Sequence, residues 1–154
     1  MIDPRRPGRY VRLEEQLTGL LHKSPDLTAG MATICALLHA KLRHHSWTGF
    51  YLLREDGALT VGPYQGPVAC QVLADGGVCL HCVETKAPVV VPDVEAFPGH
   101  VACDSRSKSE IVLPLMRGDQ VVAVLDIDSH QMAQFDQDDV APLMAIVKLL
   151  QPLL

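Results

Sequence analysis

A predicted β-hairpin decides the fold: Glu110-Ile111-Val112-Leu113-Pro114-Leu115-Met116-Arg117-Gly118-Asp119-Gln120-Val121-Val122-Ala123-Val124-Leu125-Asp126-Ile127-Asp128. Two strongly β-forming runs flank Arg117-Gly118-Asp119, which we interpret as a three-residue loop. Met116 then pairs with Gln120, and Glu110 lies directly opposite Asp126. Because both faces are apolar up to the polar end of the strands, we expect the sheet to be covered on both sides.

Three acidic residues, Glu110, Asp126 and Asp128, stand at the polar end of this hairpin. In the predicted register their side chains lie on one face of the sheet, where like charges raise one another's pKa. Two functional interpretations follow. The carboxylates bind a cation such as a metal ion or an ammonium group, or one carboxyl keeps its proton at neutral pH and serves as a general acid. Solvated acids at strand ends are the structural alternative.

A polar loop leads into the hairpin and carries a cysteine. The residues Val101-Ala102-Cys103-Asp104-Ser105-Arg106-Ser107-Lys108-Ser109-Glu110 place one thiol and one carboxylate at the two ends of this loop. A cysteine beside a possible proton donor indicates thiol chemistry.

The rest of the chain alternates helical and strand signals in an order typical of an α+β domain with a mainly antiparallel central sheet. We expect residues 1–9 to form a flexible tail and residues 10–154 to form one domain with helices on both faces of the sheet. Neither a repeat nor a linker indicates a second domain. The elements predicted before the hairpin are helices at 10–22, 25–43 and 78–86 and strands at 47–53, 58–62, 68–73 and 89–91.

Two helix starts carry recognisable signals. Ser24 is a predicted N-cap, with Pro25 at the first helical position. Asp136 is the predicted N-cap of the last helix. Pro142 lies several positions further along and predicts either a kink or a helix that starts later.

Two aromatic residues flank a glycine in the strand at 47–53. Because side chains alternate along a strand, Trp47, Gly49 and Tyr51 share one face, and the glycine leaves a hollow floor between the rings. The hollow indicates a ligand pocket; core or edge packing of the aromatics is the alternative.

Composition excludes several classes of protein. A chain of 154 residues with 48% hydrophobic content is typical of one packed domain. The net charge of −5 provides no basic footprint for nucleic acid. No apolar run approaches the ~18 residues of a membrane span, and no signal-peptide core follows the first residues. We therefore expect a cytoplasmic protein that binds neither nucleic acid nor a membrane.

Five cysteines without a secretory signal indicate redox, catalytic or metal chemistry rather than a disulfide framework. Cys79 and Cys82 match C-x-x-C, which marks a redox pair or half of a zinc site. His100 and Cys103 complete a four-ligand zinc set if the loops meet. Otherwise Cys82 is an incidental thiol, and Cys35, beside the apolar stripe of its helix, is a small buried hydrophobe.

Six motifs together carry a family resemblance. They are Trp47-Thr48-Gly49-Phe50-Tyr51; Gly62-Pro63-Tyr64-Gln65-Gly66 with Ala69-Cys70; Gly77-Val78-Cys79; Phe97-Pro98-Gly99-His100-Val101-Ala102-Cys103-Asp104; Ser109-Glu110-Ile111-Val112-Leu113-Pro114-Leu115; and Val124-Leu125-Asp126-Ile127-Asp128-Ser129. In these motifs, from about residue 10 to about 150, the chain resembles the free methionine-R-sulfoxide reductases, which are stand-alone GAF domains. The three cysteine boxes and the carboxylates occur in the family's order.

The resemblance implies roles for the site residues. Cys103 corresponds to the catalytic thiol, Cys70 to the partner that closes a disulfide, and Cys79 to an auxiliary or alternative resolving thiol. The segment between Cys70 and Cys79 is one residue shorter than in the family, so either thiol remains a candidate to resolve Cys103. The residues implied to hold substrate are Trp47, Tyr51, Glu110, Asp126 and Asp128, among which Glu110 supplies a proton.

The implied reaction is the reduction of free methionine-R-sulfoxide. The Cys103 thiolate attacks the sulfoxide sulfur, Glu110 protonates the departing oxygen, and the sulfenic acid on Cys103 condenses with Cys70. No metal or organic cofactor is implied; thioredoxin is the implied reductant and a homodimer the implied assembly. A GAF sensory module without catalysis and a zinc-stabilised interaction domain are the alternatives.

Overall fold

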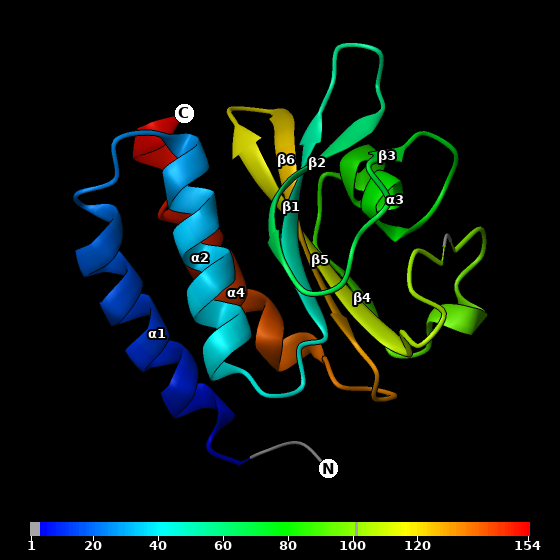
Figure 1. Ribbon diagram of the computed structural model, residues 1–154, viewed down its shortest axis with the longest axis horizontal. Coiled ribbons are helices and arrows are strands. Elements are labelled where there is room, and N and C mark those ends of the chain that lie inside the picture. The colour runs from blue at the N-terminus through cyan, green and yellow to red at the C-terminus, as the bar shows by residue number, and fades with distance from the viewer. Residues whose placement is uncertain (1–3, 101) are drawn as a thin grey trace.

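The predicted hairpin lies inside a six-stranded antiparallel sheet of order β3-β2-β1-β6-β5-β4 (Figure 1). The computed structural model describes residues 4–100 and 102–154. Val101, part of the predicted cysteine motif, lies outside them. The strands are β1 (Trp47–Leu53), β2 (Leu59–Gln65), β3 (Val72–Leu73), β4 (Val89–Val91), β5 (Ser109–Arg117) and β6 (Gln120–Ser129); the helices are α1 (Arg6–Leu21), α2 (Leu27–Lys41), α3 (Val78–Thr85) and α4 (Val140–Lys148), with short 3₁₀ turns η1 (Val94–Ala96), η2 (Gln137–Asp139) and η3 (Gln151–Leu153).

The register of the hairpin differs from the prediction by two residues. Arg117 pairs with Gln120, so the loop has two residues, and Glu110 lies opposite Asp128 rather than Asp126. A bulge between Leu115 and Met116 shifts the pairing by one further residue. A slip of one residue would move Glu110 to the other face, whereas a slip of two restores it. The predicted loop is therefore wrong, and the predicted face of Glu110 is correct.

The two faces of the sheet bury different layers. Helices α1, α2 and α4 cover one face, and α3 with its adjoining loops lies over the other (Figure 1). The predicted α+β fold with helices on both faces is confirmed. Fully buried side chains fill the layer between this face and its helices. They include Leu17, Ile34, Leu38 and Leu143 of the helices and Phe50, Ile111, Leu113 and Leu125 of the sheet. This apolar layer leaves the opposite face free to carry polar groups.

Helix α1 begins at Arg6, four residues before the predicted start. The Arg6 guanidinium lies 2.6 Å from Oδ2 of Asp139, and the Tyr10 hydroxyl donates a 2.7 Å hydrogen bond to Oδ1 of the same residue. Asp139 is fully buried. The predicted tail is therefore wrong for residues 6–9, where a long-range ion pair holds the first turn and Pro7 stands at a helix-start position.

The ends of several other helices and strands differ from the predicted positions, because of local hydrogen bonds and proline. The N-cap of α2 is Asp26, not Ser24, and its Oδ1 accepts the Ala29 N–H. Asp136 caps η2, and α4 starts only at Val140, so that Pro142 falls in its first turn. The strand predicted at 68–73 shrinks to β3. Within the described ranges, none of the helices has the length and apolar character that a membrane crossing requires.

The Arg6–Asp139 pair is expected to contribute strongly to stability. Removing one partner leaves an uncompensated buried charge, so Arg6→Met should lower the free energy of unfolding by about 3 kcal/mol. Arg12 is exposed on the same helix, and Arg12→Met should change it by less than about 0.5 kcal/mol. Urea unfolding of both variants measures the difference. Equal losses of unfolding free energy in the two variants would show that the Arg6–Asp139 pair does not stabilise the fold.

Candidate active site

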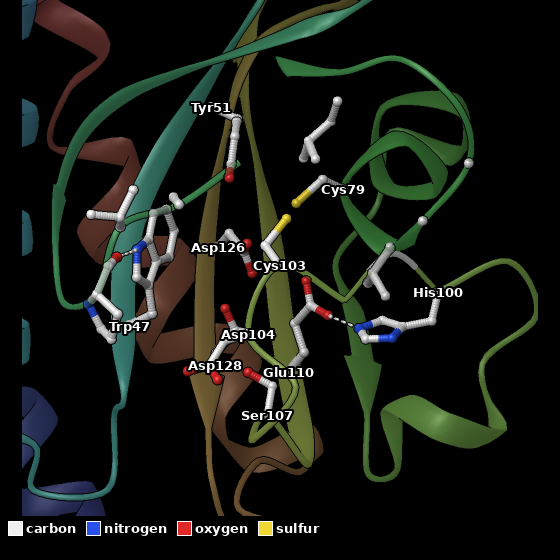
Figure 2. Close-up of a pocket in the computed structure, with 17 residues that line it drawn as sticks. Trp47, Tyr51, Cys79, His100, Cys103, Asp104, Ser107, Glu110, Asp126 and Asp128 are labelled. Carbon is white, nitrogen blue, oxygen red and sulfur yellow. Dashed lines mark hydrogen bonds and ion pairs between the residues drawn. The ribbon is translucent and has the colours of Figure 1, made fainter. Parts of the chain in front are cut away.

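A pocket opens on the sheet face that α3 partly covers. Its floor comes from β1, β5 and β6, one wall from the start of α3, and the other from the loop that carries Cys103 (Figure 2). All eight residues predicted for the site except Cys70 line this pocket. The lining side chains used below are Trp47, Tyr51, Cys79, His100, Cys103, Asp104, Glu110, Asp126 and Asp128.

The three predicted carboxylates meet on the pocket floor because of strand register. Asp128 pairs with Glu110 of β5 on one side and with Trp47 of β1 on the other. Asp126 lies two residues along β6, on the same face, and pairs with Gly49. Glu110 and Asp126 are only 5% and 6% exposed. The prediction that these acids converge is confirmed, and solvated acids at strand ends are excluded for Glu110 and Asp126.

Burial makes these acids hard to ionise. It raises the pKa of Asp126 to about 6, although hydrogen bonds from the Glu110 carboxyl and the Cys79 thiol lower it in part. Burial, then the charges of Asp126 and Asp128, raise the pKa of Glu110 well above its usual value. The pKa of Asp128 is raised by burial and by Asp126. The folded protein therefore favours the protonated form of Glu110, and a general acid must hold such a proton.

The predicted hollow above Gly49 is filled by the Trp47 indole itself. A Cβ at position 49 would collide with that ring and with Tyr64. The indole stacks between Tyr51 and Tyr64, with ring centroids 5.7 Å and 5.2 Å away. Its Nε1 donates to the Pro67 carbonyl at 3.1 Å. The glycine thus makes room for the Trp47 ring of the pocket rather than for a ligand, and Tyr64, which does not line the pocket, packs against that ring.

Two of the predicted redox cysteines form a disulfide, Cys70–Cys103, with Cα atoms 5.6 Å apart. Cys103 is exposed on its loop, and Cys70 is half-buried just before β3. The Tyr51 hydroxyl donates to the Cys70 carbonyl at 3.0 Å, which ties this segment to β1. The disulfide joins the loop wall of the pocket, through Cys103, to the segment just before β3.

The C-x-x-C motif does not form the zinc set that was weighed above. Cys103 is bonded to Cys70, and Cys82 is fully buried in the core and does not line the pocket. Cys79 lies in the first turn of α3, where it is 4% exposed and points at the acids (Figure 2). Burial, followed by the charge of Asp126, raises the pKa of the Cys79 thiol far above its usual value.

Two further residues of the cysteine loop line the pocket: His100, which the sequence suggested only as a zinc ligand, and Asp104, which had not been predicted. His100 Nε2 lies 3.7 Å from Oε2 of Glu110 (Figure 2), and burial lowers the pKa of the imidazole. Asp104 accepts hydrogen bonds from Arg106 at 3.0 Å and contacts His130 at 3.2 Å. Their only sequence signal is position, since both lie within three residues of Cys103.

Comparisons with known proteins agree with this geometry. Residues 25–151 match the GAF domain family. Over 146 residues the chain is 40% identical to the free methionine-R-sulfoxide reductase of Escherichia coli (strain K12), covering 94% of this chain and 88% of that protein. It resembles the structure of free methionine-R-sulfoxide reductase from Neisseria meningitidis in complex with its substrate, with TM-score 0.89, 37% identity, and coverage of 93% and 86% of the two chains. For fRMsr of Staphylococcus aureus in its reduced form, the values are 0.87, 40%, 93% and 93%.

The sheet order, the helix layers and the enclosed pocket define a GAF domain as the class of protein. The chain is also 37–40% identical to free methionine-R-sulfoxide reductases over more than nine-tenths of its length, which identifies the family within the GAF domains. The chain belongs to the free methionine-R-sulfoxide reductase family of GAF domains.

Asp126→Asn is expected to stabilise the protein at pH 7.5. Folding raises the pKa of Asp126 from 3.8 to about 6, so the native state binds this proton more tightly than the unfolded state. The free energy of unfolding then falls as the pH rises between these two values. The variant avoids this loss, which is on the order of 3 kcal/mol. Urea unfolding at pH 4 and pH 7.5, in buffer with a chelator, measures the gain.

Asp75→Asn is the matched control, because Asp75 is exposed in a loop outside the acid cluster. It should leave the pH dependence of unfolding unchanged. A lower stability of Asp126→Asn than of the unaltered protein at pH 7.5 would contradict the raised pKa.

Proposed function

We propose that this protein reduces free L-methionine-(R)-sulfoxide to L-methionine with Cys103 as nucleophile. The single observation that carries the proposal is the Cys70–Cys103 disulfide held over a buried acid cluster. A disulfide there is the expected product state of a thiol reductase, and a protonated carboxyl beneath it is the expected acid.

In the first step the Cys103 thiolate attacks the sulfoxide sulfur, and Glu110 protonates the sulfoxide oxygen. The oxygen passes to Cys103, which becomes a sulfenic acid, while the methionine sulfur is reduced by two electrons. The Glu110 proton and the sulfoxide oxygen both end in the sulfenic acid. Glu110 then takes a proton from solvent, equal to the one released when the Cys103 thiol became a thiolate, so that the step balances. Burial of Glu110 supports this role because it keeps the carboxyl protonated at neutral pH.

In the second step the Cys70 thiol attacks the Cys103 sulfenic acid, a disulfide forms, and water leaves. The observed pairing favours Cys70 over Cys79 as the resolving thiol, since Cys79 is buried and remains a free thiol. A thioredoxin-type dithiol then reduces the disulfide by exchange. The exposure of Cys103 gives such a dithiol access.

We further propose that the protein acts as a cytoplasmic homodimer, as its family resemblance implies.

Charge explains why the free amino acid is preferred. Asp126 and Asp128 offer carboxyl oxygens to an α-ammonium group, with the negative charge on Asp126, whereas a methionine sulfoxide residue in a polypeptide has a neutral amide there. The N-terminus of α3 also faces the pocket, and its N-cap, Gly77, supplies no side-chain hydrogen bond to the first-turn N–H groups. These groups suit the substrate carboxylate. Trp47 and Tyr51 then enclose the methyl sulfoxide end.

Single-turnover chemistry tests the proposed reaction without assuming a reductant. Pre-reduced protein mixed with free methionine-R-sulfoxide should release one methionine per chain and form the Cys70–Cys103 disulfide. Cys103→Ser should release none. Cys82→Ser, which alters a buried thiol outside the pocket, should behave like the unaltered protein. Chromatographic quantification of methionine with thiol titration measures both products; turnover of the S epimer at the same rate would contradict the stereochemical claim.

Kinetic constants separate the roles of the acids. Glu110→Gln removes the proton donor and should lower kcat by about 10²–10⁴-fold with a smaller change in KM. Asp126→Asn removes an ammonium contact and should mainly raise KM. Steady-state assays with a thioredoxin system and NADPH measure both constants. The reverse pattern would exchange the two assignments.

A further inference from the structure

Three potential metal ligands converge on the pocket floor from three different elements. Cys79 Sγ of α3, one carboxyl oxygen of Glu110 on β5 and one of Asp126 on β6 all lie within 4.8 Å of one another. Each residue is buried, and each lines the pocket, so an ion can reach them through its mouth. Figure 2 shows the Cys79 sulfur and the two carboxyls directed at the same space.

An unsatisfied oxygen points independently to a missing ligand. Asp126 Oδ1 is fully enclosed and has no hydrogen-bond partner among residues 4–100 and 102–154. A buried carboxylate oxygen without a donor costs free energy, and a bound cation removes that cost. The substrate ammonium is one such cation, and a metal ion is another.

The donor set selects the kind of cation. One sulfur and two carboxylate oxygens suit a borderline-soft ion such as Zn²⁺ and suit Mg²⁺ or Ca²⁺ poorly. Around tetrahedral zinc such ligands lie roughly 3.5 Å apart, so side-chain shifts of about 1 Å close the site. Three protein ligands leave a fourth position for water.

We propose that Cys79, Glu110 and Asp126 form a Zn²⁺ site that overlaps the substrate ammonium position, so that zinc and substrate exclude each other. The zinc site stands on the geometry alone, whereas the competition rests on the proposed function. Occupied by zinc, Glu110 cannot donate a proton, and the ion acts as a reversible inhibitor. Binding displaces the Cys79 thiol proton and therefore strengthens as the pH rises.

Cobalt(II) spectroscopy of the disulfide form tests the site without turnover. In this form Cys70 and Cys103 carry no thiol. Of the free cysteines in the part of the chain that the structure describes, Cys79 is the one that lines the pocket. Co²⁺ should produce a thiolate-to-cobalt charge-transfer band with tetrahedral d–d bands, and Zn²⁺ should abolish both. Cys79→Ser should lose the band and Cys82→Ser should retain it. Glu110→Gln, which keeps the thiol, should weaken Co²⁺ binding.

Each result decides the proposal. Absence of the band in the unaltered protein, or its persistence in Cys79→Ser, overturns the zinc site. Free methionine should displace Co²⁺; a band unaffected by saturating methionine overturns the overlap. Single-turnover release of methionine by metal-free protein is measured separately, so that a failed reductase proposal is distinguishable from a failed zinc site.

Discussion

The site depends on the cost of burying three carboxyl groups on one face of a β-sheet. Glu110, Asp126 and Asp128 cannot all ionise so close together in a poorly hydrated pocket, and their raised pKa values are the result. The same cost favours a proton on Glu110, which we propose serves catalysis, and a charge on Asp126, which we propose binds a cation. The acidic floor is thus less stable than an apolar one, and its chemistry follows from that instability.

The two faces of the sheet divide stability from function. One face is largely apolar and packs against α1, α2 and α4, and the Arg6–Asp139 pair ties the first helix to the last. The other face is open enough to hold a pocket, a disulfide and a free buried thiol. A rigid apolar layer behind the strands fixes the carboxyl positions, which a reaction at a single sulfur atom requires.

Sequence reasoning succeeded where side-chain periodicity alone decided the structure. It failed where two local features, a shorter turn and a bulge, offset each other. The strand and helix types, and the common face of Glu110 and Asp126, followed from periodicity. The hairpin loop was mispredicted, because a bulge after Leu115 compensates for the shorter turn and no residue pattern announces it. Gly49 was correctly singled out, yet the ring that fills its hollow is Trp47 from the same strand.

By itself the sequence determined the α+β class, the acidic cluster and the candidate redox cysteines, because alternation along strands and motif order are local properties. Only the tertiary structure decided which thiols meet. Cys70 and Cys103 are 33 residues apart and are joined by a disulfide, while Cys79 faces the acids and Cys82, three residues later, lies in the core. Loop paths and a helix's rotation set those contacts, and neither is encoded in spacing along the chain.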